Sequence, residues 1–362
     1  MTTVRGRGRD NGARPVALRL QVASEVRIER VEWFWRSRIA VRSLTLLLSR
    51  QGIGKSTFTA QLAARASRGE LDGELAGQPC ATLFCTAEDS ITATAVPRLC
   101  GAGADLDRIA FLHVESDGVE GVLTLPDDAE ELGKRAIEAG AALLVLDPLV
   151  AFLPSKIDSH RDQHVRRALA PLAQLAAERE LAILAVLHPN KGTSSDALTR
   201  ASGSIGFTAA ARSVLVLGVD PNDPDGEAGR GRILAHAKSN LAPLAPSLAC
   251  RIEPCQVESE AGATVATSRL LIGDESGVSA ADLLVAADPD ESSAQGEAEE
   301  FLRAELGEGP VAYNALMERA RDAGHSEKTL RRVKARLRIK SERTGQLGGG
   351  GEWHWALPEG RK

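Results

Sequence analysis

The sequence predicts an α/β domain in which a mostly parallel sheet, with helices on both faces, is built around a phosphate-binding loop. Two observations carry this prediction. The apolar run at residues 44–48 leads into a glycine-rich loop at residues 49–57, and apolar residues at helical spacing then continue to Gly69. Further apolar runs of strand length alternate with helical patterns as far as residue 218, which is the order expected for a parallel sheet.

The loop at residues 49–57 has the P-loop pattern G-x-x-x-x-G-K-[ST], except that Ser49 stands at the first glycine position. Such a loop wraps backbone N–H groups around phosphates. We expect Lys55 to bind the β- and γ-phosphate oxygens of ATP, and Ser56 to bind Mg²⁺. A chance glycine-rich turn is the weaker alternative, and Ser49 leaves the exact loop geometry open. The expected nucleotide-binding residues are Gln51, Gly52, Ile53, Gly54, Lys55, Ser56 and Thr57.

Length and composition bound the class of protein. A chain of 362 residues favours two unequal domains, and its 43% hydrophobic and 26% charged residues are ordinary for a soluble globular protein. We expect no membrane span, because no apolar run is long enough. The arginines near the N-terminus precede no apolar segment, which argues against a secretory signal. Five cysteines without a C-x-x-C pair favour reduced thiols and a cytoplasmic location.

The net charge of −5 conceals a strongly basic segment. Residues 326–343 hold eight Lys or Arg against two Glu, a local balance of +6, which leaves the rest of the chain near −11. A basic segment on an otherwise acidic chain indicates a localised contact with a polyanion such as DNA.

Residues ahead of the first strand fall into two parts. Residues 1–25 are rich in Arg and Gly and are expected to form a flexible arm. Trp33 and Trp35 then lie just before the first strand. An aromatic lid over the adenine ring is possible for this pair, but a core plug against the sheet is the favoured interpretation.

Adjacent carboxylates follow the second strand, which spans residues 81–86. Glu88 and Asp89 would lie at the carboxyl edge of the sheet beside the P-loop, where ligands bind in α/β folds. One carboxylate there can deprotonate the water that attacks the γ-phosphate. We assign that role to Glu88 and the N-cap of the next helix to Asp89.

Two later strands also end in polar residues. Residues 141–146 form a buried strand that ends in Asp147, the Walker B pattern in which an aspartate holds the Mg²⁺ shell. Residues 181–187 form another, which ends in His188. His188 is either a γ-phosphate sensor or a structural histidine whose hydrogen bonds are made within the fold. Beyond residues 213–218, strand-like runs continue to about residue 272, so the sheet is expected to gain an antiparallel side.

The C-terminal part is predicted to be a winged helix-turn-helix, with three helices followed by a hairpin at residues 340–355. A solvated basic face on a small oligomerisation domain is the alternative. Trp353 and Trp355 alternate along the hairpin and are expected to pack the wing onto the helices. The expected DNA contacts on the third helix are Lys328, Arg331, Arg332 and Arg336. The expected domains are the arm at 1–25, the ATPase domain at 26–287, an acidic linker at 288–297 and the winged helix at 298–358.

Taken together, residues 29–275 resemble the RepA-like branch of the RecA-fold ATPases (AAA_25-type), which contains replicative helicases of plasmids and phages. The segments that carry the resemblance are SRQGIGKST (49–57), TAED (86–89), LLVLDPL (143–149), LHPNK (187–191), RASGSIGFTAAARS (200–213) and HAKSN (236–240).

The resemblance implies a RecA-like P-loop core and a ring, with a hexamer expected, that uses ATP and Mg²⁺. It gives Lys55, Ser56, Glu88, Asp147 and His188 the roles assigned above. It also implies that Arg212 is an arginine finger that reaches a neighbouring subunit's nucleotide, with Lys238 or Arg200 assisting. The loop from Asn190 to Arg200 would face single-stranded DNA in the ring channel, with Asn190 and Lys191 as contacts.

The sequence therefore predicts an ATP hydrolase that acts on DNA, as a helicase or helicase loader for a plasmid, phage or integrated element. A ParA-type partition ATPase is a second interpretation, because Arg50 stands where that family has its signature basic residue. Gln51 and the motifs after the P-loop argue against it. A third interpretation is a DNA-binding regulator that uses ATP as a switch without unwinding. A structural scaffold would not need Lys55, Glu88 and Asp147 together.

Overall fold

The computed structural model describes residues 20–116, 119–154, 162–188, 198, 205–286, 289–307, 309–337, 339–344 and 352–358. The chain divides into one unit of residues 1–31 and a second of residues 32–362. Within the described part of the first unit, the regular structure is a 3-10 turn at Ala23–Glu25. Residues 1–19, most of the expected basic arm, lie outside the described residues.

A sheet of nine strands organises the second unit, in the order β13-β12-β11-β10-β3-β9-β8-β4-β5. The run from β10 to β5 is parallel, and β11 to β13 join it antiparallel at the β10 side. This confirms the predicted mostly parallel sheet with an antiparallel side. The strands are β3 (Ser43–Leu48), β4 (Ala81–Thr86), β5 (Ile109–Phe111), β8 (Ala141–Asp147), β9 (Ala182–Leu187), β10 (Ser213–Val219), β11 (Gly231–Ser239), β12 (Ser247–Glu258) and β13 (Thr264–Ser276).

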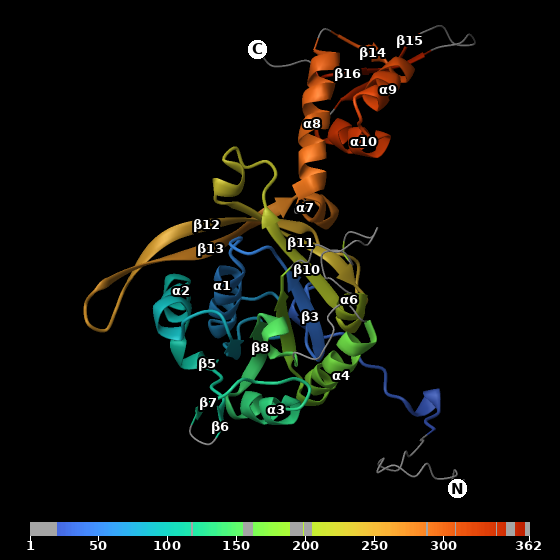
Figure 1. The fold of residues 1–362 in the computed structure, drawn as a ribbon. Helices are drawn as coiled ribbons and strands as arrows, with labels where there is room; N and C mark the ends of the chain where they lie inside the picture. Colours follow the sequence, from blue (N-terminus) through green and yellow to red (C-terminus); the bar gives the residue numbers. More distant parts are fainter. Residues whose placement is uncertain are drawn as a thin grey trace. The chain divides into compact units, whose positions relative to one another are not determined.

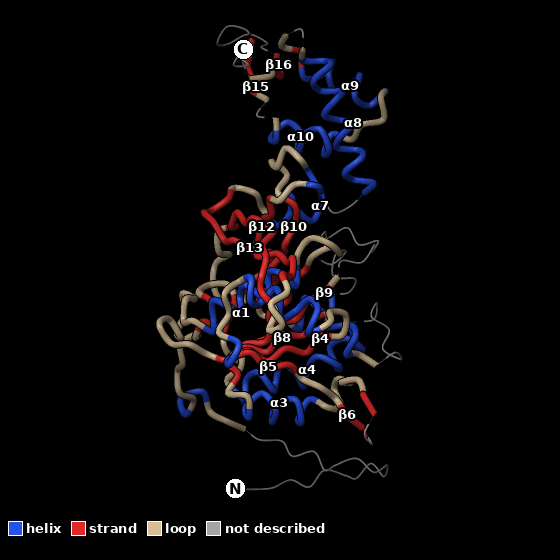
Figure 2. Tube along the Cα trace, turned by 90° about the vertical axis from the view of Figure 1, so that its left-hand side faces the viewer, coloured by secondary structure: helices blue, strands red, loops and turns tan. Residues whose placement is uncertain are grey.

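Helices cover both faces of the parallel strands (Figure 1). Every residue of β3 and β9 is buried, as expected for central strands with helices on each side. Figure 2 shows β8, β4 and β5 between α1 on one side and α3 and α4 on the other. The helices are α1 (Lys55–Ser67), α2 (Val96–Gly101), α3 (Ala129–Glu138), α4 (Asp162–Arg179), α6 (Ile205–Ala210) and α7 (Ala280–Ala286).

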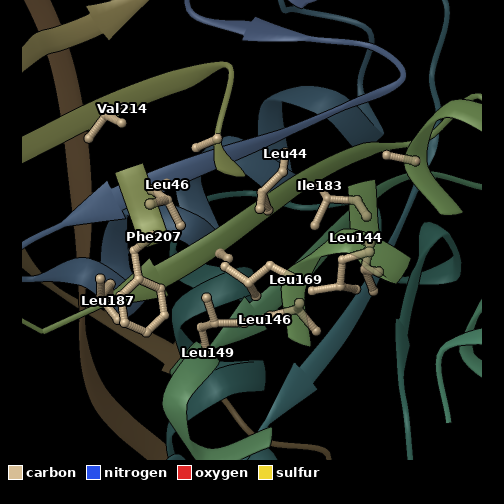
Figure 3. Close-up of a cluster of buried hydrophobic side chains, with 14 of the residues drawn as sticks. Leu44, Leu46, Leu144, Leu146, Leu149, Leu169, Ile183, Leu187, Phe207 and Val214 are labelled. Atoms are coloured by element: carbon tan, nitrogen blue, oxygen red, sulfur yellow. The ribbon is translucent and has the colours of Figure 1, made fainter. Parts of the chain in front are cut away.

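Side chains alternate along β3 between two buried clusters. Leu44 and Leu46 point toward the α4 and α6 face, where they meet Leu169 and Phe207 (Figure 3). Leu47 lies in the other cluster with Phe58 of α1. The P-loop strand is therefore held rigidly from both sides, which fixes the position of the loop that follows it.

The tryptophans before the first strand are part of the core. They lie on a small hairpin of β1 (Trp33–Trp35) and β2 (Ile39–Ala40), and Trp33 and Trp35 are only 9% and 5% exposed. The ring centroid of Trp35 lies 6.4 Å from that of Phe58. The core plug is therefore the observed arrangement, and an adenine lid is not.

The C-terminal part has its own buried cluster, which includes Leu302, Leu316, Leu330 and Trp355. Its three-stranded sheet has the order β14-β16-β15. The acidic stretch at 288–297, which the sequence predicts to be a linker, is helical from Pro289 onward, since proline suits the first turn of a helix. The elements are α8 (Pro289–Leu306), β14 (Val311–Ala312), α9 (Tyr313–Asp322), α10 (Glu327–Arg336), β15 (Lys340–Thr344) and β16 (Glu352–Ala356).

Short elements complete the second unit. They are the π-helical turn Ile91–Ala95, the 3-10 turns Leu106–Arg108, Leu149–Phe152 and Gly226–Ala228, and the small hairpin of β6 (Glu115–Ser116) and β7 (Val119–Glu120). All five cysteines are free thiols. Among the described residues, no helix is both long enough and apolar enough to cross a membrane.

Candidate functional site

Residues at the carboxyl ends of four neighbouring parallel strands meet at one edge of the sheet. The P-loop follows β3, the Glu88–Asp89 pair follows β4, Asp147 ends β8, and His188 follows β9. Carboxyl ends of parallel strands share an edge, so strand order alone brings these groups together. The structure thus gathers Lys55, Ser56, Glu88, Asp147 and His188, which the sequence had placed in one site.

The backbone of the P-loop accepts serine at the position where the pattern has its first glycine. Positive φ angles occur at Gly52 (79°) and Gly54 (104°) and not at Ser49, so serine replaces glycine there without backbone strain. Ser49 is 2% exposed, and its N–H donates to the Leu187 carbonyl at 3.3 Å, which extends the β3–β9 pairing. Ser49 therefore ends the strand, and the turn itself begins after it.

Lys55 lies folded across the loop. Its Nζ donates to the Arg50 carbonyl at 3.2 Å and lies 3.1 Å from Nδ1 of His188. Burial lowers the pKa of the Lys55 ammonium, and the charges of Asp147 and Glu88 partly offset this effect. An anionic phosphate placed among these groups would restore the favoured charged state of Lys55.

Ser56 and Asp147 present two oxygens side by side. The Ser56 hydroxyl donates to Oδ2 of Asp147 at 3.1 Å. Asp147 is 8% exposed, and burial raises its pKa to about 6, an effect that the Ser56 hydrogen bond and Lys55 oppose. A hydroxyl and a carboxylate fit Mg²⁺, which typically takes one or two protein oxygens and completes its shell with phosphates and water. Within the described residues there is no cluster of three or more His, Cys, Asp or Glu side chains that could hold a metal.

The two carboxylates after β4 have different surroundings. Asp89 forms an ion pair with Arg98 of α2 at 2.6 Å, whereas the Glu88 side chain is 60% exposed and its Oε2 lies 3.7 Å from Nε2 of His188. Ser90, and not Asp89, caps the following turn by accepting a hydrogen bond from the N–H of Ala93 at 3.2 Å. The expected N-cap role of Asp89 was therefore wrong, because Arg98 holds that carboxylate.

Arg212 and Lys238 lie at the end of the sheet where the parallel strands begin, whereas the P-loop lies at the end where β3 finishes. Ser213 pairs with Thr45 near the start of β3, and the N–H of Arg212 donates to the Leu44 carbonyl at 2.9 Å. The Lys238 ammonium donates to the Ala211 carbonyl at 2.9 Å and to the Thr208 carbonyl, at the end of α6. Neither side chain is brought to Lys55 of the same chain.

A basic cluster accompanies Arg212 at this edge. Burial lowers the pKa of Lys238, and the nearby charges of Arg212 and Arg166 lower it further. Arg166 lies on α4 and, like Arg212, is exposed. The edge therefore carries three neighbouring cations, of which Lys238 is committed to carbonyl groups.

Of the DNA-binding residues expected from the sequence, the structure describes the side chain of Arg331. Asn190, Lys191 and the assisting Arg200 lie outside the described residues, as do the side chains of Lys328, Arg332 and Arg336 on α10. Arg331 is exposed on α10 and forms an ion pair with Glu327 at 2.6 Å.

The matched region of the chain now identifies its family. Residues 13–194 match the AAA domain family AAA_25, which is half of the 362 residues. The chain belongs to this AAA domain family. The match contains the P-loop, Glu88, Asp147 and His188, so the AAA_25 family predicted from the sequence is confirmed, and the matched region is an AAA-type ATPase domain.

Two solved structures are similar to parts of the chain. The chain resembles "Crystal structure of the RadB recombinase" with a TM-score of 0.41 and 14% identity, over 59% of this chain and 89% of that chain. It resembles a second solved structure, described as an "ATPase Domain", with a TM-score of 0.42 and 14% identity, over 58% of this chain and 81% of that chain. The comparison with curated proteins finds no match.

Sequence reasoning missed the contacts that support the P-loop of this AAA domain from behind. The buried Arg232 donates through Nε to the Ile53 carbonyl at 3.0 Å, 179 residues away. Arg50 forms an ion pair with Glu227. Gly54 has a φ of 104°, which favours glycine, and a Cβ atom there would also lie 2.5 Å from Cδ1 of Ile252 on β12. The partners are distant in sequence and follow no local pattern.

Proposed function

We propose that this AAA domain protein is an ATP-dependent motor ATPase that acts on DNA, as a RepA-like ring helicase or helicase loader in the replication of a plasmid, phage or other mobile element. One observation carries the proposal. A closed P-loop, an Mg²⁺-type oxygen pair and an exposed carboxylate converge at one sheet edge, at Lys55, Ser56–Asp147 and Glu88.

ATP would bind with its phosphates inside the loop of residues 51–57. The loop N–H groups and Lys55 would bind the phosphate oxygens, with Lys55 leaving the Arg50 carbonyl to do so. Ser56 and Asp147 would hold Mg²⁺, which neutralises charge on the β- and γ-phosphates when it is bound.

Glu88 would orient and deprotonate the attacking water, since its exposed carboxylate lies at the rim of the site. His188 lies between Lys55 and Glu88, which suits it to report the γ-phosphate to the base. The ion pair with Arg98 argues against Asp89 as the base, because the pair both neutralises and holds that carboxylate.

Arg212 would act on the nucleotide of a neighbouring subunit. The exposed side chain lies at the sheet edge opposite to its own P-loop, so a contact within one chain is not available to it. A ring, with six subunits expected, would bring this edge of one subunit to the P-loop edge of the next. Lys238 would support Arg212 by fixing the end of α6 rather than by reaching the nucleotide.

DNA would be contacted in two places. Asn190 and Lys191 would meet single-stranded DNA in the ring channel. Residues 298–358 would form a winged helix-turn-helix whose basic helix, α10, contacts duplex DNA, in keeping with the order helix, strand, two helices and hairpin. The free thiols favour a cytoplasmic location.

Strand displacement on forked DNA, run beside ATP turnover with Mg²⁺, tests this proposal. A motor should separate the strands only with hydrolysable ATP, and Lys55→Ala should abolish both activities. Slow hydrolysis and nucleotide-dependent DNA binding without separation would instead support a ParA-like or regulatory ATP switch. Absence of ATP binding would overturn both functions.

A further inference from the structure

One tryptophan of the four is exposed, and it lies on the C-terminal hairpin. All four are described. Trp33, Trp35 and Trp355 are 9%, 5% and 4% exposed, whereas Trp353 is 53% exposed. The expectation that Trp353 packs the wing onto the helices was therefore wrong, and only Trp355 of the pair does so.

The exposed ring lies on the same sheet face as the buried one. Residues two apart along a strand share a face, so Trp353 and Trp355 of β16 project to the same side. Lys334 of α10 covers Trp355, with Nζ 4.4 Å from the ring centroid. Trp353 lies one step further toward Thr344 and Glu352, the last residue pair before the connection of the two strands, and beyond this contact. The face that forms the domain core thus continues as an exposed surface beside α10.

A cation lies directly opposite the exposed ring. Arg343 of β15 is the cross-strand partner of Trp353, and directly opposed residues share a face. Arg343 is exposed and makes no ion pair with any residue that the structure describes, whereas Arg331 on α10 is held by Glu327. The charge available for a ligand is therefore greater at the hairpin than at Arg331.

We propose that Trp353 and Arg343 form a base-stacking site for DNA near the Thr344–Glu352 end of this hairpin. Trp353 stacks on an unpaired base next to a duplex end, and Arg343 contacts the adjacent phosphate. A flat aromatic face beside a cation matches a base and its phosphate, and aromatic stacking accepts any base. The net charge of +6 in residues 326–343 favours a polyanion over a neutral or basic protein surface.

This inference rests on the proposed action on DNA, but it places the contact on the hairpin rather than on α10 or in a ring channel. It also predicts a preference among DNA shapes. A duplex with a single-stranded overhang offers an unpaired base beside paired ones, whereas a blunt duplex does not. The overhang should therefore bind more tightly to the same protein.

Fluorescence of the full-length protein, without nucleotide, tests the contact directly. Acrylamide should quench mainly Trp353, because the other three tryptophans are buried. Adding the overhang duplex should quench the emission and protect the remainder from acrylamide. In Trp353→Phe both DNA effects should disappear, although binding measured by anisotropy of labelled DNA persists. Binding of DNA with no change in Trp353 emission would overturn the proposal.

Matched variants separate stacking from general charge. Trp353→Ala should weaken overhang binding about 5- to 150-fold, the range expected for one stacked base, while Trp353→Phe retains most of the affinity. Arg343→Ala should reduce the salt dependence by about 0.7–0.9 log units per log salt, the loss of one phosphate contact. Lys340→Ala is the control, since Lys340 is an exposed cation on the other face of the same hairpin.

The outcomes also separate this site from the proposed motor. ATP turnover without DNA should be unchanged in Trp353→Ala, because the residue lies outside the nucleotide site. If Lys340→Ala and Arg343→Ala weaken DNA binding equally, binding depends on the overall positive charge and not on the position of Arg343, which would contradict the proposal. If DNA stacks on Trp353 but the protein does not separate DNA strands, the stacking site is supported and only the proposed motor activity is refuted.

Discussion

His188 links the P-loop lysine to the carboxylate of Glu88. Its Nδ1 lies 3.1 Å from the Lys55 ammonium, and its Nε2 lies 3.7 Å from Oε2 of Glu88. An ammonium can only donate, so Nδ1 accepts, and the proton of a neutral ring sits on Nε2, facing Glu88. Burial lowers the pKa of His188, and the charge of Lys55 adds to this, which favours that neutral ring.

Loss of this link should reduce turnover more than binding. Nε2 of His188 and Oε2 of Glu88 lie 3.7 Å apart, beyond hydrogen-bond distance, and we expect this pair to tighten to a hydrogen bond when ATP binds. His188→Ala should then lower kcat about 10- to 150-fold, the value of one hydrogen bond to a charged group. The dissociation constant for ATP should change little, since Lys55 and the loop N–H groups remain. Steady-state kinetics and equilibrium nucleotide binding on the same preparation check this. A change confined to ATP affinity would make His188 part of the binding loop alone.

The position of Arg212 predicts complementation between inactive subunits. Arg212→Ala should keep ATP binding but reduce turnover about 10³- to 10⁵-fold, the range of arginine fingers supplied to another active site. Mixed with Glu88→Gln, it should recover part of the activity, because some interfaces then pair an intact finger with an intact base. The measurement is ATP turnover across mixing ratios, after subunit exchange has been verified.

Two outcomes would count against a finger that acts between subunits. Mixtures that stay inactive after verified exchange would make Arg212 a structural residue. Light scattering that detects only monomer with ATP and DNA present would remove the ring itself.

The burial of His236 should lower the stability of the folded chain in acid. Its Nδ1 accepts the N–H of Ala245 at 3.0 Å, its Nε2 lies 3.0 Å from the Ser213 hydroxyl, and burial lowers its pKa from 6.5 to about 4. Below pH 6.5 the unfolded chain takes up a proton that the folded chain resists. The folded state therefore loses stability as the pH falls from 6.5 toward 4, by up to about 3 kcal/mol at 1.36 kcal/mol per pKa unit.

A variant that cannot be protonated isolates this effect from those of the carboxylates. His236→Asn can still accept from Ala245 but does not titrate, so its urea midpoint should fall less between pH 7 and pH 4.5 than that of the parent. The comparison uses the change with pH within each protein, since the smaller side chain lowers stability at every pH. Parallel pH profiles would show that His236 takes up its proton at the same pH in the folded and unfolded chains, and would contradict the prediction.

The meeting of the candidate site residues at one end of the sheet was largely predictable, because each part is encoded locally. A buried strand followed by a polar residue gives both the element and its edge, as at Asp147 and His188. The supporting contact of Arg232 with Ile53 was not predictable, because it depends on how β11 folds back beside the P-loop 179 residues later. The assignment of Asp89 failed for a local reason. Arg98, nine residues later, forms an ion pair with its carboxylate, and Ser90 caps the turn instead.

In the C-terminal part, the alternating pattern predicts which residues share a face but not which of them are buried. Alternation correctly placed Trp353 and Trp355 on one face, but the position of α10 decides which of them is covered. Composition alone did not indicate the secondary structure of the acidic residues 288–297. Proline in the first turn and good helix formers after it allow a helix there.

ATP turnover with and without single-stranded DNA, measured for the parent and for Glu88→Gln, tests the central claim most directly. The parent should hydrolyse ATP with Mg²⁺ and accelerate on DNA, while Glu88→Gln should bind ATP and turn it over about 10²- to 10⁴-fold more slowly. Asp89→Asn is the matched control, and its turnover should stay near the parental rate. Parental turnover in Glu88→Gln, or a loss confined to Asp89→Asn, would contradict the account.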